Sequence, residues 1–443
     1  MPGLSVERYG LEEVEEPDLL RDVFPYDRVP VARFDTEEAP LSQATAMWIT
    51  DTTFRDGQQA REPYTVEQIV RIFELLHRLD GGSGLLRQSE FFLYSEKDRA
   101  AVEAVQALGH RYPEVTSWIR AVKSDFELVR AAGVKETGIL TSCSDYHIFK
   151  KLGWTRSEAL HAYLDIVDAA LEAGIRPRCH FEDLTRADVQ GFALPLARAL
   201  TERGRQAGVP VKIRLCDTMG VGLPWPAAAL PRGVPKLARA FVEEAGVASE
   251  QLEWHGHNDL FKVHANSVAA WLYGCAAINA TLLSTGERTG NSPLEAAVVE
   301  YVGLRGDEGG KIDLRVLTEI GEYMRRECGV PVPATYPLLG SEFNVTRAGI
   351  HADGLLKDEE IYNVFDTRKL LGRPVGVSVN DKSGAAGVAF WVGQRLGRRV
   401  DKHELGVEGM YREIQGLYDR GRVASLTQEE LMELARRHLP EWF

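Results

Sequence analysis

Eight short apolar or β-branched runs, each ending in polar residues, alternate with long segments of helical periodicity in the first two thirds of the chain. This alternation is typical of repeated βα units. The runs occupy residues 48–57, 85–92, 114–121, 136–145, 176–183, 211–218, 252–259 and 277–288. Eight units in roughly 255 residues match a (β/α)8 TIM barrel, although alternation alone also permits a doubly wound sheet. We predict an α/β fold built on the TIM barrel.

Helix start signals support this pattern of elements. Thr65 with Gln68, and Thr155 with Glu158, have the spacing of capping boxes and stand directly before apolar residues at helical spacing. No Gly-rich dinucleotide fingerprint and no phosphate-binding P-loop motif occurs in the sequence. These observations favour the barrel over a nucleotide-binding sheet.

The 443 residues exceed what one hydrophobic core usually holds, so we expect more than one domain. Residues 1–47 lack sustained periodicity and predict an extension on the surface. Residues 48–308 form the predicted catalytic barrel. Residues 309–443 predict a smaller, mainly helical C-terminal region with helices near 313–328, 406–418 and 427–438, acting as a lid and dimerisation region.

The composition limits the kinds of partner that the protein can bind and the compartment in which it is expected. A net charge of −13 argues against binding to nucleic acid or to anionic membranes. No apolar run is long enough to span a bilayer, and the N-terminus is acidic where a targeting peptide would be basic, which predicts a cytoplasmic protein. The five cysteines form no C-x-x-C pair and are predicted to be reduced and buried, although Cys143, Cys179 or Cys216 as a nucleophile is the alternative.

Polar residues gather at the ends of the predicted strands. In a TIM barrel these ends converge at one face, where the active site lies. The candidates are Arg55, Asp56, Glu90, Arg120, Ser144, Glu182 and Thr218. Glu90 and Arg120 are equally well explained as members of ion pairs.

The tripeptide His255-Gly256-His257 predicts a metal site in the seventh strand. Side chains alternate across a strand, so two histidines two residues apart face the same side and can reach one ion. With Asp56 and an oxygen from Asn291, they form a ligand set suited to a divalent metal. Two hydrogen-bonded core histidines are the alternative, which the adjoining Asn258 and Asp259 disfavour.

Three motifs, DTTFRDGQQ, HGHND and GERTGN, resemble those of the metal-dependent acyl-CoA condensing and lyase barrels, the DRE-TIM superfamily. The segment FNVTRAGIHADGLLKDEEIY resembles the part that follows the barrel in 2-isopropylmalate and homocitrate synthases, which pure lyases lack. The segments RQSEFFLYS, EVTSWIRA, SCSDYHIFKKL, RPRCHFEDLTRAD and EWHGHNDLFKV are most similar to the Re-face-specific citrate synthases.

The resemblance implies a site residue by residue. The metal ligands would be Asp56, His255, His257 and Asn291, holding Mn2+ or else Co2+, Mg2+ or Zn2+. Condensation of acetyl-CoA with oxaloacetate, followed by thioester hydrolysis, would give citrate and CoA. The resemblance also implies a homodimer, in which two catalytic residues reach the site across the interface. The implied catalytic residues are Arg55, Glu182, His351 and Tyr362, of which His351 and Tyr362 come from the partner subunit.

The implied substrate contacts include Thr218, which matches the family residue that binds the substrate carboxylate. The second carboxylate of oxaloacetate needs further donors, for which Arg120, Arg178 and Ser144 are candidates at the barrel mouth. Ion pairs with Asp145, Glu182 or Asp183 explain the same residues equally well.

Other functions stay open at this stage. The chain could act on another 2-oxo acid, as homocitrate and 2-isopropylmalate synthases do. Lys262 and His264 stand where isopropylmalate synthases usually carry small or apolar residues, which disfavours that substrate. An acyl-CoA lyase and a non-catalytic metal-binding regulatory protein are the remaining alternatives.

Overall fold

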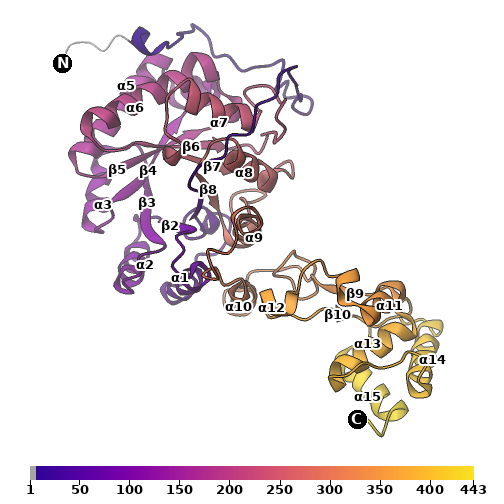
Figure 1. The fold of residues 1–443 in the computed structure, drawn as a ribbon. Coiled ribbons are helices and arrows are strands. Elements are labelled where there is room, and N and C mark those ends of the chain that lie inside the picture. The colour runs from indigo at the N-terminus through magenta and orange to yellow at the C-terminus, as the bar shows by residue number, and fades with distance from the viewer. Residues whose placement is uncertain (1–5) are drawn as a thin grey trace. The chain divides into compact units, whose positions relative to one another are not determined.

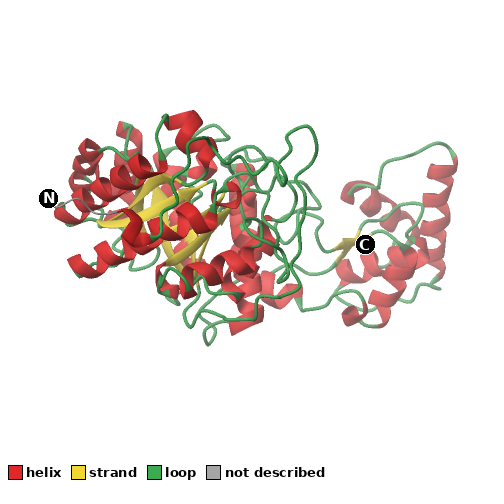
Figure 2. Ribbon diagram, turned by 90° about the horizontal axis from the view of Figure 1, so that it is seen from above, coloured by secondary structure: helices red, strands yellow, loops and turns green. Residues whose placement is uncertain are grey.

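The computed structural model describes residues 6–443 and divides the chain into two compact units, Met1–Ile312 and Asp313–Phe443. The first unit is a closed barrel of eight parallel strands in the order β1 to β8. The strands are surrounded by helices (Figures 1 and 2). They are β1 Trp48–Asp51, β2 Leu86–Phe91, β3 Glu114–Ile119, β4 Glu136–Ser142, β5 Arg176–Glu182, β6 Lys212–Asp217, β7 Leu252–Gly256 and β8 Ala277–Ala280. The predicted TIM barrel is confirmed.

The first and last strands are shorter than expected. β1 ends at Asp51 because the carboxylate of Asp51 accepts hydrogen bonds from the backbone and hydroxyl of Thr53, which turns the chain. Arg55 therefore lies in the following loop, and Asp56 begins the short helix η2 Asp56–Gln58. The GERTGN segment lies beyond β8 in a loop after η8 Leu282–Ser284. These corrections move the site residues from strand ends onto the loops above the barrel.

The helices around the barrel begin where the sequence signals predict. Both predicted capping boxes form, with Thr65 and Thr155 each accepting a hydrogen bond from the residue three positions later. The principal helices of the unit are α1 Val66–Asp80, α2 Glu96–Ala107, α3 Phe126–Ala131, α4 Asp145–His147, α5 Arg156–Glu172, α6 Leu194–Ala207, α7 Val234–Glu243, α8 Val263–Leu272 and α9 Leu294–Arg305.

The N-terminal segment packs on the barrel of its own chain. After η1 Val6–Tyr9 it runs without further helices or long strands to β1. The backbone N–H of Asp18 donates to Asp145 at 2.8 Å, and Arg156 donates to the carbonyl of Glu12 at 2.9 Å. These contacts hold the segment beside β4 and α5.

The second unit is mainly helical and has a core of its own, which includes Val379, Val388, Trp391, Met410 and Leu431. Its elements are α10 Arg315–Arg326, β9 Val345–Thr346, α11 Gly349–Lys357, α12 Thr367–Leu371, β10 Gly376–Val377, α13 Gly384–Leu396, α14 Leu405–Asp419 and α15 Gln428–His438. β9 and β10 form a small parallel pair. Among the described residues, no helix combines the length and apolarity needed to cross a membrane.

Candidate metal centre and active site

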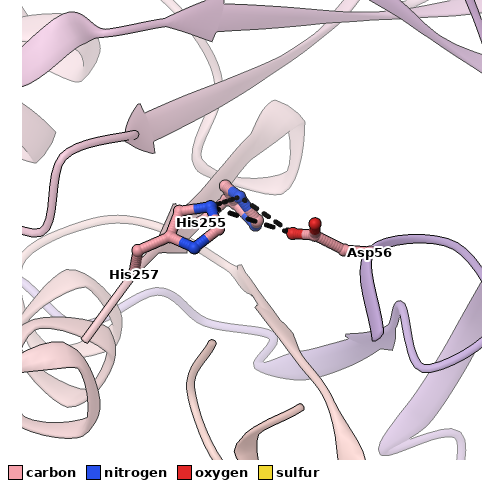
Figure 3. Close-up of side chains that lie close together, drawn as sticks. All are labelled: Asp56, His255 and His257. Atoms are coloured by element: carbon pink, nitrogen blue, oxygen red, sulfur yellow. Dashed lines mark hydrogen bonds and ion pairs between the residues drawn. The ribbon is translucent and has the colours of Figure 1, made fainter. Parts of the chain in front are cut away.

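Asp56, His255 and His257 meet above the barrel interior. The two imidazole Nε2 atoms lie 3.3 Å apart, and they lie 3.5 and 3.9 Å from Asp56 Oδ2 for His255 and His257 respectively. All three residues are buried, at 2, 6 and 6% exposure. Figure 3 shows both histidine rings turned toward the carboxylate. The two histidines therefore lie on the same side of β7, as predicted.

Asn279 in β8 orients the ring of His255. The side-chain amide of Asn279 donates to the carbonyl of Thr50 at 3.2 Å, so its oxygen faces His255. That oxygen lies 2.7 Å from His255 Nδ1, which must carry the proton. The lone pair of His255 Nε2 is then directed toward Asp56. Sequence reasoning missed Asn279, whose only signal was an asparagine in an otherwise apolar strand.

Asn291 completes the group from the loop after β8. Its side-chain nitrogen donates to Asp56 Oδ2 at 2.7 Å, while its buried oxygen Oδ1 has no hydrogen-bond partner. A Cβ at Gly286 would collide with this side chain, so the close approach requires glycine there. An unpartnered buried oxygen next to three ligand atoms fits a metal ligand.

The protonation states also suit a metal. Burial would raise the pKa of Asp56, but the charge of Arg55 and the hydrogen bond from Asn291 act in the opposite direction, so the pKa is lowered and the carboxylate is ionised. Burial lowers the pKa of His255 and that of His257, which keeps both imidazoles neutral at neutral pH. An anionic carboxylate and neutral imidazoles are the forms that bind metals.

Among the described residues, Asp56, His255 and His257 form the one cluster of three such side chains whose ligand atoms all lie within 4.8 Å of one another. Mixed nitrogen and oxygen donors on one side leave other coordination positions for substrate. The residues present therefore fit a divalent metal ion.

Arg55 lies next to this cluster and is fixed by Glu90 of β2. The Nε of Arg55 donates to Glu90 at 2.9 Å, and its Nη1 lies 3.8 Å from Asp56. Glu90 is fully buried and also accepts from Arg214 at 3.0 Å. The guanidinium is thus held beside the metal ligands by a buried carboxylate.

Glu182 ends β5 and contacts His147 and Lys151. His147 Nδ1 lies 2.9 Å from the carboxylate, Lys151 Nζ lies 3.3 Å away, and Ser142 donates to it. Burial would raise the pKa of Glu182, but the hydrogen bonds and charges of His147, Ser142 and Lys151 lower it to about 2. Glu182 is therefore an anion at neutral pH.

Three further predicted residues lie around the barrel mouth. Thr218 Oγ1 accepts the backbone N–H of Asp183 at 2.8 Å, which leaves its hydroxyl hydrogen to donate. Ser144 is fully buried and donates to Asp183. Arg120 has a 63% exposed side chain and pairs through two hydrogen bonds of 3.1 Å with Asp125.

Arg178 does not lie at the mouth as expected. It is fully buried inside the barrel, where it donates to Glu90 at 3.0 Å and to Glu136 at 3.1 Å. Arg178, His180 and Glu182 alternate inward along β5, and Arg178 is the member farthest from the carboxyl end of the strand. Its partners are neither Asp145, Glu182 nor Asp183, because those carboxylates belong to the upper end of the barrel.

A loop clamp holds the metal side of the mouth. Arg288 donates to both oxygens of Asp259 at 2.8 and 3.1 Å and also to the carbonyl of Thr218. The backbone of Asn258 donates to Gly290 at 3.0 Å. The loops that follow β6, β7 and β8 are thereby joined around His257 and Asn291.

His351 and Tyr362 belong to the second unit and lie next to one another. Their ring centroids are 4.3 Å apart, and His351 Nδ1 is 3.2 Å from Thr346 Oγ1. Tyr362 is 46% exposed, and the neighbouring Ile361 and Val364 are more exposed still. The two predicted catalytic residues of the second unit thus form one exposed pair.

The cysteines are free and buried. Burial raises the pKa of the thiols of Cys143, Cys179 and Cys216. A raised pKa disfavours the thiolate that a nucleophile requires. The prediction of reduced, buried core cysteines is confirmed.

A family model described as HMGL-like matches residues 46–324, which include the barrel and every residue of the metal cluster. The chain belongs to the HMGL-like family. Enzymes of this family are metal-dependent, in agreement with the cluster in the structure. The resemblance read from the DTTFRDGQQ, HGHND and GERTGN motifs is confirmed.

Among members of the HMGL-like family, a citrate (Re)-synthase of Syntrophus aciditrophicus is 53% identical over 440 residues, covering 98% of this chain and 70% of that protein. A citrate (Re)-synthase of Clostridium kluyveri is 48% identical over 437 residues, covering 98% of this chain and 96% of that protein. The crystal structure of hydroxymethylglutaryl-CoA lyase from Pseudomonas aeruginosa superimposes with a TM-score of 0.52 and 20% identity, covering 65% of this chain and 95% of that one. This last likeness supports the fold alone.

Proposed function

We propose that this chain is a citrate (Re)-synthase, which condenses acetyl-CoA with oxaloacetate and hydrolyses the thioester to release citrate and CoA. The observation that carries the proposal is the buried Asp56, His255 and His257 cluster in a chain of 53 and 48% identity to two citrate (Re)-synthases. Both alignments span nearly the whole chain, including the His351 and Tyr362 segment.

Asp56, His255, His257 and Asn291 would hold a divalent ion, for which we propose Mn2+, with Co2+, Mg2+ and Zn2+ as alternatives. The bound ion would supply Lewis-acid polarisation of the keto group of the 2-oxo acid. Arg55, fixed by Glu90 at 2.9 Å, would stabilise the negative charge that develops on the keto oxygen. Because its position is set before substrate arrives, little reorganisation is needed during the reaction.

Thr218 would donate its free hydroxyl hydrogen to the carboxylate next to the keto group. For the second carboxylate of oxaloacetate, we propose Arg120, whose exposed guanidinium follows β3 at the mouth. Ser144 would act through Asp183 rather than by direct contact, because its hydroxyl is buried and already donates to that carboxylate. Arg178 is not retained as a substrate contact.

The methyl group of acetyl-CoA must lose a proton before the carbon–carbon bond forms. With a pKa of about 2, Glu182 is too weak a base to retain that proton, so it would orient and pass it on. We propose that His351 and Tyr362 of the partner subunit of a homodimer complete the relay. Water then attacks the thioester carbonyl of the citryl-CoA formed, which releases citrate and the CoA thiol.

The reaction is tested by measuring the release of free CoA from acetyl-CoA by protein supplied with Mn2+. Oxaloacetate, 2-oxoglutarate and 2-oxoisovalerate are assayed in parallel. We expect turnover with oxaloacetate and little with the other two acids. A preference for either of those would replace citrate by homocitrate or 2-isopropylmalate as the product. Cleavage of a hydroxyacyl-CoA without condensation would instead indicate a lyase.

The His257→Ala variant tests the role of the cluster. It should lose CoA release while it keeps the wild-type circular dichroism spectrum. His161→Ala is the matched control, because that imidazole is exposed on α5 and bonds only the carbonyl of Ser157. CoA release by His257→Ala at the wild-type rate would reject a metal-dependent mechanism and favour a different site.

Mixing inactive subunits tests the shared site. A His257→Ala protein and a His351→Ala protein are each expected to be inactive. If His351 acts across a homodimer interface, mixed dimers regain up to about half of the sites on subunit exchange. Activity that stays absent in dimers shown to be mixed would place His351 in the site of its own chain.

A cytoplasmic location remains a prediction.

A further inference from the structure

The second unit contains a cavity of about 1110 Å3 that the proposed reaction does not use. It is lined by the end of α11, by β10, by the C-terminal half of α13 and by the start of α15. Buried side chains of Val379, Phe390, Trp391 and Leu431 form an apolar and aromatic part of its wall. Its size exceeds the roughly 300–1,000 Å3 of most small-molecule sites, so it can accept a ligand larger than a simple anion.

Four arginines line the same cavity, and all are exposed: Arg368, Arg395, Arg398 and Arg399. None of the carboxylates described in residues 6–443 lies within ion-pair distance of these guanidinium groups. Arg395 instead donates to the side chain of Gln428 and lies over the ring of Trp391 at 5.5 Å. Arg398 lies over the ring of Trp442 at 4.5 Å.

The acidic residues of the cavity do not neutralise this group. Of the three acidic residues that line it, Glu342 pairs with Arg347 and Asp358 accepts a backbone N–H from Glu360, while Glu359 has no ion pair with the four arginines among the described residues. Four unpaired guanidiniums on one cavity contrast with a chain whose 65 acidic residues outnumber its 52 basic ones. An anion bound in the cavity would offset this local excess of positive charge.

We propose that this cavity binds a nucleoside polyphosphate or the chemically equivalent ADP moiety of coenzyme A. The planar forks of arginine suit phosphate oxygens, which they bind through two parallel hydrogen bonds. The wall formed by Phe390 and Trp391 provides an apolar surface for the base, which an inorganic phosphate could not cover. Every residue that lines the cavity belongs to the second unit, and none of them is a proposed metal ligand.

Calorimetric titration of the full chain with ATP, ADP, CoA and inorganic tripolyphosphate tests the proposal. We expect ATP or CoA to bind with an affinity that the Arg398→Ala/Arg399→Ala double variant weakens at least tenfold. Arg412→Ala/Arg420→Ala is the matched control, because it removes two exposed arginines of the same unit that do not line this cavity. Circular dichroism of both double variants checks that the second unit remains folded.

The ligands separate the two sources of the ADP chemistry. If ATP binding depends on Arg398 and Arg399, the ligand is a free nucleotide. If only CoA binding depends on these two arginines, the ligand is the coenzyme. Equal affinity for tripolyphosphate and ATP would overturn the role assigned to the aromatic wall. Absence of binding by every probe, or binding unchanged in the double variant, would overturn the site. Binding that is unchanged in the double variant leaves the citrate reaction untouched, because the release of CoA from oxaloacetate and acetyl-CoA is measured separately.

Discussion

The Asn279→Ala substitution should weaken Mn2+ binding at the metal cluster without touching a ligand. Asn279 is fully buried and fixes His255 through a hydrogen bond of 2.7 Å to Nδ1. Its loss frees the ring to rotate and to place its proton on Nε2, the atom that faces Asp56. Removal of such an outer partner costs about 10- to 100-fold in metal affinity, equal to about 1.4–2.7 kcal/mol. Full burial places the expected effect toward the upper end, because bulk water cannot readily replace the lost acceptor.

The measurement is a calorimetric titration of chelator-treated protein with Mn2+ alone. Asn279→Asp is the matched control, because a carboxylate oxygen still accepts from Nδ1 although the bond to Thr50 is lost. We expect the aspartate variant to bind Mn2+ within a few-fold of wild type. Thermal unfolding without metal identifies any general loss of stability. A folded Asn279→Ala protein with the wild-type dissociation constant would refute the idea that this hydrogen bond sets the tautomer.

Three further substitutions test other parts of the structure. Burial would raise the pKa of Glu136, but Lys212 and neighbouring cations lower it to about 2, so the ionised group stabilises the fold above pH 4.5 and loses this effect toward pH 2. Between pH 5 and 3, the free energy of unfolding measured in urea should therefore fall by about 2 kcal/mol less in Glu136→Gln than in wild type. An equal fall in both proteins would contradict this. Phe261 has a φ of 59° and is 93% exposed. Phe261→Gly should therefore have a free energy of unfolding up to about 1 kcal/mol higher than Phe261→Ala, and unfold at a higher urea concentration. Equal midpoints of the two variants would reject backbone strain at this position. Arg288→Lys loses the two-pronged bond to Asp259, so CoA release should fall about tenfold with the fold intact, and undiminished turnover would show that the loop clamp is dispensable.

The barrel and the metal cluster could be predicted because both follow from periodicity. Alternation of apolar runs with helical segments fixes the number of βα units, and a period of two places His255 and His257 on one side of β7. Asp56 was predicted from its position near the end of β1, although it lies in the loop beyond. The capping boxes at Thr65 and Thr155 were equally local signals, and both form.

Contacts between side chains on different strands could not be predicted in the same way. Asn279 orients His255 from the adjacent β8 strand, and Arg178 reaches Glu136 across neighbouring strands. A sequence gives the face to which a side chain points, but the partner depends on the stagger of the strands around the barrel. The prediction of Arg178 at the mouth is wrong because Arg178 lies near the start of β5, two inward positions before Glu182.

Glu90 shows why an ion-pair explanation and a functional one need not exclude each other. It is fully buried and bonds Arg55, Arg178 and Arg214, whose charges hold its pKa well below its usual range although burial acts in the opposite direction. Buried ion pairs of this kind contribute little net stability compared with apolar packing, so stability alone does not account for three guanidiniums around one carboxylate. The arrangement does fix the Nε of Arg55, which leaves the rest of that guanidinium beside Asp56. The ion pair is therefore the means by which the barrel interior positions a charge at the metal site.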